Sequence, residues 1–485
     1  MTGEELLLLL PIILVTATAV MTMLMVAVKR SHAVSCLISA AGLTLALLSL
    51  VLVVPLAPAE VTPLLRVDAF SLFFTALILL SGLAITLFSY PYLSNLEDHQ
   101  DEFYLLLVIA VLGALVMVSS THFITAFLGM ETLSVCLYGM IAYPLHRRET
   151  AQYPMEASIK YLVLSAVSSG FFLFGVALLY AQTGTLHFSS IAASLSGLEG
   201  TVAPAYFVVA TLLIVIGFAF KLSLVPFHLW TPDVYEGAPL PATAFLATVG
   251  KLAMAALLMR YLSVSGLLGS ESIVFVLSMM AAFSIIAGNL LALLQSNLKR
   301  LLSYSSIAHM GYLLIALLTL DTLQDSLGAE AVSFYLVAYV LMSLGAFGVM
   351  MVVSDSAQER DHIGHYQGLF WRNPWLALVF TAMLLSLAGI PLTVGFIAKF
   401  YIVAAGVEGA KWGLLFAMIV GSGIGLFYYL RIIYRMLTPL EHFEPMREAG
   451  LKELLSHCVL FVLLSALIAF GVYPNGLMTL LESVV

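Results

Sequence analysis

Four lysines and one glutamate lie inside stretches of the chain that are otherwise almost entirely apolar. The lysines are Lys160, Lys221, Lys251 and Lys399, and the acidic residue is Glu131. A charged side chain at membrane depth costs several kcal/mol unless it is paired or hydrated, so residues of this kind usually mark functional sites. An amine or a carboxyl group in such a place can bind and release a proton. The residue types therefore indicate a path for protons or other cations.

Two of these lysines lie close to a proline in the same apolar stretch. Pro226 follows Lys221 by five residues, and Pro391 precedes Lys399 by eight. Proline removes a backbone donor and clashes with the preceding turn, so both helices are predicted to bend or break. A broken helix in a membrane is tolerated only where protein or a water-filled cavity satisfies the freed backbone groups. Each lysine is therefore expected beside such a place.

Each candidate also has a plain structural interpretation. A long lysine side chain can reach the lipid headgroups, which suits Lys160, about one turn from its predicted helix end, better than Lys221. Glu131 could be neutral and bonded to a hydroxyl group. His309 could relay protons, since imidazole titrates near neutral pH, or it could be a core histidine bonded to a Ser or Tyr. His228, just past the first predicted break, leaves the same two possibilities open.

The composition is that of a polytopic helical membrane protein. Of the 485 residues, 62% are hydrophobic and 9% are charged, whereas about a quarter of the residues are charged in soluble domains. Runs of about 20 apolar residues can cross the hydrocarbon core. Fourteen such segments are predicted, at 5–28, 34–55, 69–93, 103–119, 121–143, 156–181, 204–229, 240–262, 272–294, 300–320, 331–353, 375–405, 411–436 and 455–479.

The basic residues outside these interiors predict the orientation of the chain. With the N-terminus placed outside, twelve of them lie on the cytoplasmic side: Lys29, Arg30, Arg147, Arg148, Lys299, Arg300, Arg360, Arg372, Arg431, Arg435, Arg447 and Lys452. Three lie outside: Arg66, Arg260 and Lys411. Because Lys and Arg are enriched in cytoplasmic loops, both termini are predicted to be periplasmic. The acidic start, Glu4 and Glu5, argues against a cleaved signal peptide.

The predicted segments group into four units. Residues 1–102 hold three helices, 103–262 and 263–436 hold five each, and 437–485 holds the last one. An odd number of crossings makes the two five-helix units insert in opposite senses, as the inverted repeats of secondary transporters do. The two helices with a lysine and a proline are the seventh and the twelfth, which take corresponding places in the two repeats. Corresponding broken helices indicate a transport site.

The sequence contains no motif for a redox cofactor or a metal. Cys36, Cys136 and Cys458 are far apart and lie in or beside apolar runs, which is typical of small buried side chains and not of zinc or iron–sulfur ligands. No glycine-rich phosphate loop or dinucleotide-binding fingerprint follows a predicted strand. The chain is therefore expected to hold no cofactor and no metal.

Two stretches of the sequence resemble one known family. Residues 218–239 read FAFKLSLVPFHLWTPDVYEGAP, and residues 299–312 read KRLLSYSSIAHMGY. The second closely resembles a signature of the antiporter-like subunits of respiratory complex I, the proton-pumping NADH:quinone oxidoreductase, and of related multisubunit sodium/proton antiporters. The first resembles the seventh helix and the following loop of the complex I members, and the N-type members in particular. The resemblance covers nearly the whole chain.

The resemblance implies a path for protons through the interior charges. Glu131 matches the acidic residue of the fifth helix, which is thought to pair with a lysine and to modulate it. The implied path runs from Lys221 through hydrated side chains to Lys251, and then by way of His309 to Lys399, the exit-side lysine of the twelfth helix. Lys160 matches a further family position within residues 156–161.

The resemblance also implies partners. NADH oxidation and quinone reduction, with FMN, iron–sulfur clusters and quinone, are expected in other complex I subunits. This chain would then be a non-redox subunit that lies beside other antiporter-like membrane subunits. It is not expected to bind nucleic acid. Two alternatives remain. A subunit of a multisubunit sodium/proton antiporter is disfavoured by the loop at 230–239. A membrane anchor without transport is disfavoured by the cost of its interior charges.

Overall fold

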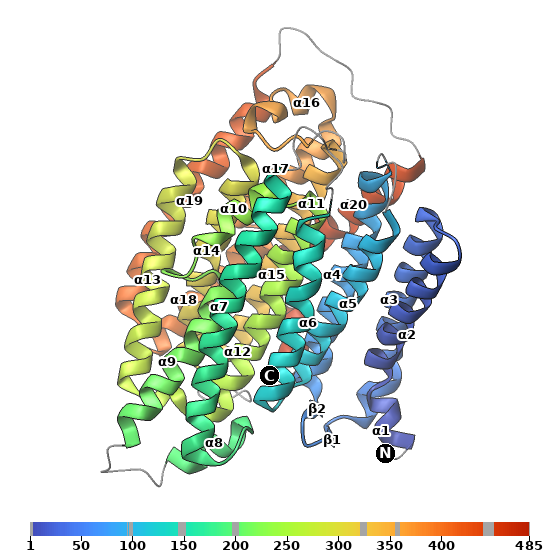
Figure 1. The fold of residues 1–485 in the computed structure, drawn as a ribbon. Helices are drawn as coiled ribbons and strands as arrows, with labels where there is room; N and C mark the ends of the chain where they lie inside the picture. Colours follow the sequence, from blue (N-terminus) through green and yellow to red (C-terminus); the bar gives the residue numbers. More distant parts are fainter. Residues whose placement is uncertain are drawn as a thin grey trace.

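The computed structural model describes residues 3–94, 96, 100–143, 152–195, 203–320, 327–354, 359–439 and 451–484. In these ranges the regular structure is helical except for one hairpin, in which β1 (Ala59–Thr62) pairs antiparallel with β2 (Leu65–Val67). The long helices run side by side in a single bundle (Figure 1). The predicted all-α class is confirmed.

The helices follow the four predicted units in order. The first contains α1 (Gly3–Leu8), α2 (Leu10–Val28), α3 (His32–Val53), η1 (Val54–Leu56) and α4 (Ala69–Leu93). The second contains α5 (Gln100–Ser119), α6 (Phe123–Ile141), α7 (Gln152–Thr183), α8 (Phe188–Leu195), α9 (Ala203–Leu222), α10 (Trp230–Gly237), α11 (Leu240–Phe245), the π-helical η2 (Leu246–Gly250), and α12 (Lys251–Ser265).

The rest of the chain has the same character. The third unit contains η3 (Leu267–Gly269), α13 (Glu271–Leu293), α14 (Leu298–Leu317), α15 (Leu327–Val353), η4 (Ile363–Tyr366), α16 (Leu369–Arg372), α17 (Pro374–Ala388), α18 (Val394–Glu408) and α19 (Trp412–Leu437). The last contains α20 (Leu451–Val472) and α21 (Asn475–Glu482). The unit boundaries themselves stay a prediction.

Twelve helical stretches in the described chain are long and apolar enough to cross a membrane. They cover twelve of the fourteen predicted segments. The segment predicted at 300–320 is α14, which has Lys299 and Arg300 in its first turn. The segment predicted at 375–405 is split into α17 and α18, of 15 residues each. A helix of that length spans about 22 Å, less than the roughly 30 Å hydrocarbon core, so the count of fourteen crossings stays a prediction.

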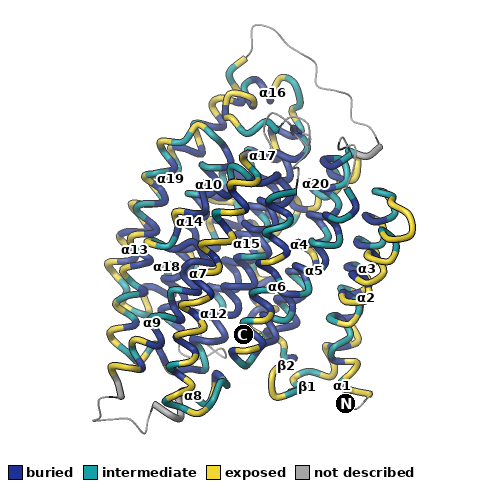
Figure 2. Tube along the Cα trace, in the orientation of Figure 1, coloured by how far each residue is buried: buried dark blue, intermediate teal, exposed yellow. Residues whose placement is uncertain are grey.

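Two helices form the centre of the bundle. In the most apolar part of the stretch through α11, η2 and α12, 94% of the residues are buried. The corresponding share is 89% in α15 but only 28% in α2. Figure 2 shows this contrast between the dark interior and the exposed α2–α3 hairpin at one edge. Helix α12, whose first residue is Lys251, is therefore surrounded by protein and not by lipid.

The two five-helix units pack in similar ways. Helix α5 packs on α6 as α13 packs on α14, and α7 packs on α9 as α15 packs on α17 and α18. Glycines let the first helices of each unit approach closely: a Cβ on Gly129 would lie 2.8 Å from the oxygen of Gly113, and one on Gly288 would lie 2.8 Å from the nitrogen of Ala308. Small residues permit such close helix contacts in membranes. This similarity supports the predicted repeat, which remains an inference.

The ends of the described chain lie toward the same end of the bundle, opposite to α16 (Figure 1). An even number of crossings requires this arrangement, and the outside placement of the termini stays a prediction. Of the residues that predicted it, Arg147, Arg148 and Arg447 lie outside the described residues, as does the side chain of Lys452.

Two basic residues that were counted as flanking the spans are buried inside the bundle instead. Arg260 belongs to α12 and bonds through two nitrogens to Asp68, at 2.8 and 2.7 Å. Lys299 belongs to α14 and forms an ion pair with Glu359, at 2.7 Å. A count of charges takes such residues as exposed because it cannot see partners so distant in the sequence.

Candidate functional site

The first predicted helix break is present directly after Lys221. Helix α9 ends at Leu222, Ser223 takes the left-handed conformation with φ of 63°, and helical structure resumes at Trp230. The indole nitrogen of Trp230 donates to the freed oxygen of Phe220, at 3.1 Å. Across the break the nitrogen of Val225 donates to Ser284 Oγ of α13, at 2.9 Å. Protein groups thus satisfy the open backbone, as membrane depth requires.

Lys221 is buried among hydroxyl groups of two other helices. Its Nζ donates to Ser134 Oγ of α6 at 2.5 Å and to Ser165 Oγ of α7 at 2.6 Å, and Tyr138 OH donates to the same Ser165 oxygen at 2.9 Å. A cavity of about 20 Å³ adjoins Lys221 and reaches Gly250, next to Lys251. A cavity of that size holds about one water molecule.

Glu131 lies on α6, one turn before Ser134, and is partly buried. Its Oε1 accepts a hydrogen bond from Ser169 Oγ of α7 at 2.5 Å. In the described chain no ion pair joins Glu131 to Lys221, and the influence of Glu131 on a lysine, which the resemblance implies, stays a prediction. Ser134, one helical turn after Glu131 on α6, accepts a hydrogen bond from Lys221. The bond to a hydroxyl group was one of the two interpretations open from the sequence.

Lys251 lies immediately after the π-helical segment and is buried. Its Nζ donates to Ser306 Oγ of α14 at 2.6 Å, and Ser306 Oγ shares a 2.5 Å hydrogen bond with Tyr339 OH of α15. A second small cavity, of about 10 Å³, is lined by Ser305, Ser306, Tyr339 and Leu387, among others. Lys251 is thus connected through hydroxyl groups to the interior of the third unit.

His309 lies one turn after Ser306 on α14 and is fully enclosed. Its Nδ1 is 2.6 Å from Tyr335 OH of α15, and its Nε2 is 3.4 Å from Tyr429 OH of α19. Tyr429 OH is also hydrogen-bonded to Ser305 Oγ. The bond to tyrosine fits the interpretation as a core histidine, and the hydroxyl groups on both ring nitrogens fit the relay. The structure supports both roles.

Lys399 belongs to α18, and its side chain reaches the second predicted break, which lies between α17 and α18. Helix α17 ends at Ala388, Gly389 takes a φ of 85°, and α18 begins only at Val394, so Pro391 lies in the connection. The Lys399 Nζ donates to the open oxygens of Leu387 at 3.2 Å and Ala388 at 2.8 Å. The ammonium group thereby caps the carboxyl-terminal end of α17, where a positive charge is favourable.

Gly389 gives a test of this arrangement. A Cβ at this position would lie 2.8 Å from Cδ and 3.1 Å from Nζ of Lys399, and its backbone would carry a strain of about 1–2 kcal/mol. Gly389→Ala should therefore displace Lys399 from its two carbonyl groups and lower the free energy of unfolding by about 1–2 kcal/mol. The measurement is thermal unfolding of the purified protein in detergent. Gly413→Ala, in open space, is the control, and equal stabilities of both variants would contradict the expectation.

Lys160 and His228 lie apart from this row. Lys160 is 41% exposed and forms ion pairs with Glu156 at 2.7 Å and Asp233 at 2.9 Å. Burial raises the pKa of Asp233, but its bonds to Lys160 and Arg300 hold it below its usual value. His228 is buried in the segment between α9 and α10. No hydrogen bond joins either residue to the other candidates in the described chain.

The hydroxyl groups around the lysines were missed by the sequence reasoning. They are Ser134, Ser165, Ser305, Ser306, Tyr335, Tyr339 and Tyr429. Part of the signal was available, because Ser134 follows Glu131 by three residues and Ser306 precedes His309 by three, which places each pair on one helix face. The tyrosines come from distant helices and carry no local signal.

A search of the described residues finds no group of three or more His, Cys, Asp or Glu side chains that could hold a metal ion. The three cysteines are free. The row itself consists of amines, an imidazole, hydroxyl groups and a carboxyl group, all of which can exchange protons.

Comparison with known proteins gives the family. The model of the family described as NADH:quinone oxidoreductase/Mrp antiporter, TM, matches residues 120–425. A chain of respiratory complex I from Thermus thermophilus is 32% identical, with a TM-score of 0.82 over 98% of this chain and 99% of that one. A chain of the membrane-bound sulfane sulfur reductase, an archaeal respiratory membrane complex, is 26% identical, with a TM-score of 0.84 over 99% and 96%.

A chain of the Mrp complex from a Dietzia species has the same fold, with a TM-score of 0.85 over 100% of this chain and 97% of that one at 20% identity. The family match covers more than half of the chain, and it includes the row from Glu131 to Lys399. The chain belongs to the NADH:quinone oxidoreductase/Mrp antiporter family, as an antiporter-like membrane subunit of the respiratory complex I type.

Proposed function

We propose that this chain translocates protons in the membrane arm of a proton-pumping NADH:quinone oxidoreductase, as its N-type subunit. The observation that carries the proposal is a row of three buried residues, Lys221, Lys251 and His309, and the partly buried Lys399. Each of them is bonded to hydroxyl or carbonyl oxygens. Buried amines without a carboxylate partner are costly, so a purely structural chain has no use for them. Amines held only by neutral acceptors can lose a proton without breaking an ion pair.

The proposed path has two parts that meet at Lys251. In the first, a proton on Lys221 crosses the adjoining cavity, by a water molecule, to Lys251. In the second, Ser306 and the small cavity beside it carry the proton toward Ser305, Tyr429 and His309. Lys399 takes the exit-side role that the resemblance implies. One of its two carbonyl partners belongs to Leu387, which lines that small cavity.

The proposed switch is Glu131. A carboxylate near Lys221 favours the charged amine, and a neutral or displaced carboxyl group favours its release. Movement of α6 relative to α7 would change this influence, because Ser169 of α7 holds Glu131 while Ser165 of the same helix holds Lys221. Lys160 stays a proposed member of the proton path and His228 a secondary candidate, both at the predicted cytoplasmic side.

The redox chemistry is assigned to partners. NADH oxidation and quinone reduction, with FMN and iron–sulfur clusters, would take place in other subunits and act on this chain through conformation and charge. The proposed location is a bacterial inner membrane with both termini periplasmic. The chain would lie beside other antiporter-like subunits.

The proposal is tested with the purified complex in liposomes. We expect NADH and quinone to drive proton uptake into the vesicles without sodium, and we expect this uptake to be abolished by a protonophore. The flavin and iron absorbance of the preparation should belong to the partner subunits. A complex that contains this chain, lacks NADH oxidation and exchanges sodium for protons would instead support the multisubunit antiporter.

A further inference from the structure

A buried ion pair lies outside the row of lysines, between Lys299 of α14 and Glu359 of the segment that follows α15. The Lys299 side chain is only 1% exposed, and its Nζ is 2.7 Å from Glu359 Oε2. Burial raises the pKa of Glu359, but the charge and hydrogen bond of Lys299 hold it below its usual value, so the carboxylate stays ionised near neutral pH. Such a pair adds little net stability, because desolvation offsets the attraction.

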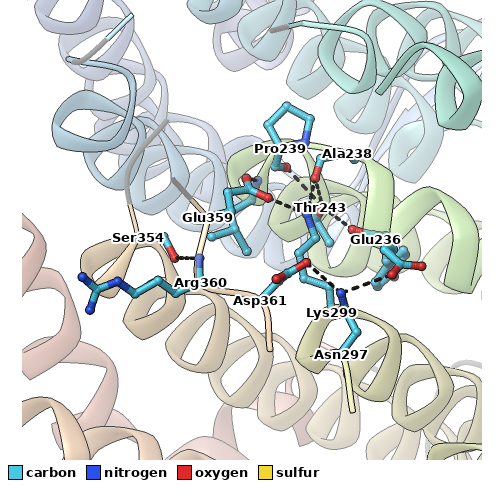
Figure 3. Close-up of polar contacts among 12 residues, drawn as sticks. Glu236, Ala238, Pro239, Thr243, Asn297, Lys299, Ser354, Glu359, Arg360 and Asp361 are labelled. Atoms are coloured by element: carbon cyan, nitrogen blue, oxygen red, sulfur yellow. Dashed lines mark hydrogen bonds and ion pairs between the residues drawn. The ribbon is translucent and has the colours of Figure 1, made fainter. Parts of the chain in front are cut away.

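The other hydrogen bonds of this ion pair reach the start of α11. Lys299 Nζ donates to the oxygen of Ala238 at 2.7 Å, and Glu359 Oε1 accepts from the nitrogen of Leu240 at 3.0 Å (Figure 3). Pro239 between them has no N–H group to donate. The first nitrogens of a helix have no partner inside it, so Glu359 satisfies one of them. Tyr92 OH of α4 also donates to Glu359 Oε1.

The two helices joined by this ion pair are those that bring Lys251 and Ser306 together. The helix that starts at Leu240 runs through η2 to Lys251, eleven residues further on, or about 16 Å along its axis. Helix α14 runs from Lys299 to Ser306, seven residues further on, or about 10 Å. A shift at the joined ends would therefore change the Lys251 Nζ to Ser306 Oγ distance of 2.6 Å.

We propose that Lys299 and Glu359 are positioning residues for the Lys251 step of the proton path. They fix the start of the Lys251 helix against α14 and so set the hydrogen bond from Lys251 to Ser306. This inference rests on the proposed function, because it takes Lys251 as part of the path. It assigns a role to two residues that do not touch the path themselves.

Other polar residues near the start of α14 form a separate set of contacts. Asp361 Oδ2 accepts from Asn297 Nδ2 at 2.7 Å, and the same nitrogen reaches Glu236 Oε1 at 3.3 Å (Figure 3). Arg300 forms an ion pair with Glu236 at 2.7 Å. The hydrogen bonds of Asp361 in the described chain do not reach α11. Asp361 thus offers a matched control in the same segment.

The test is a double-mutant cycle on the intact complex in liposomes. Glu359→Gln and Ser306→Ala should each lower proton translocation by about tenfold. If Glu359 acts through the Lys251–Ser306 bond, Glu359→Gln should cause no more than about a twofold further loss in the Ser306→Ala background, because coupled sites are not additive. Its effect on thermal stability should be equal in both backgrounds, which separates positioning from a general structural role. A full tenfold loss in both backgrounds would overturn the inference.

The control and the rescue complete the test. Asp361→Asn should retain translocation within about twofold, and a loss as large as that of Glu359→Gln would show that anchoring of the segment, and not the ion pair, matters.

If Glu359→Gln prevents assembly, the neutral pair Lys299→Gln/Glu359→Gln replaces it in the cycle, since it leaves no unpaired buried charge. Lys251→Met is run beside these variants: normal translocation in it would refute the proposed function, whereas its loss together with an additive cycle would refute only the positioning role.

Discussion

The Lys221→Met variant is expected to assemble into its complex, and its rate of proton translocation is expected to fall by about tenfold or more. Methionine keeps most of the length of the side chain, and volume-conserving changes usually cost under about 1.5 kcal/mol. The loss should come from the charge, because the ammonium group makes the bonds to Ser134 and Ser165. The rate of vesicle acidification per assembled complex, with quinone reduction measured in parallel, is the readout.

Glu131→Gln extends the same experiment. The amide keeps an oxygen that can accept the bond from Ser169 but removes the negative charge that favours protonated Lys221. The variant should weaken the same step. The double variant should be much less impaired than the product of the two single effects, since the two groups act on one proton.

Lys411→Met is the control for a lost lysine at the edge of the bundle, where Lys411 precedes the first turn of α19. It should be nearly silent. Normal proton translocation in an assembled Lys221→Met complex would remove Lys221 from the path and with it the centre of the proposed function.

The second large effect is expected for stability, at Asp68. This carboxylate accepts two hydrogen bonds from the buried Arg260, and its Oδ1 also accepts from the nitrogen of Ser71 in the first turn of α4. Asp68→Ala leaves the arginine charge buried without a partner, which costs about 3–5 kcal/mol, and it removes a helix cap worth about 1 kcal/mol. The melting temperature in detergent should fall by about 4–6 °C for a chain of this length.

The pH dependence of this effect has a definite sign. Burial raises the pKa of Asp68, but the hydrogen bonds and the charge of Arg260 lower it further, so the net pKa lies below the usual value. The stabilisation is therefore complete above the unfolded pKa of about 4 and is lost as the pH falls through the lower folded value. The gap between wild type and Asp68→Ala should shrink only in that acidic range. Arg66→Gln, at an exposed residue 3.3 Å from Asp68, is the control, and an equal loss there would contradict the assignment.

Local features of the fold could be predicted from the sequence because their causes are local. Apolar runs fixed the positions of the long helices, and the prolines at 226 and 391 marked the two breaks because each removes a backbone donor. The breaks lie where expected, after Leu222 and between Ala388 and Val394. The π-helical segment before Lys251 was not predicted, since an i→i+5 bond leaves no compositional signal.

The partners of the buried charges could not be predicted in the same way. Lys221 is bonded to Ser165, 56 residues away, and Arg260 to Asp68, 192 residues away. Such pairs depend on how the helices are arranged, which no periodicity contains. The hydrogen bond from Ser169 to Glu131 likewise joins two helices and could not be read from either segment alone. The row of candidates was thus found by residue type, and its bonding was found only in three dimensions.

The π-helical turn at Leu246–Gly250 has a consequence for how this helix evolves. A single π turn is equivalent to one residue inserted into an α-helix, and one residue corresponds to a rotation of about 100°. The insertion re-aims every side chain after it, Lys251 first, while the part before it keeps its contacts. Gain or loss of a single codon in this turn would therefore turn the lysine toward a different hydrogen-bond partner. No single substitution could make this change.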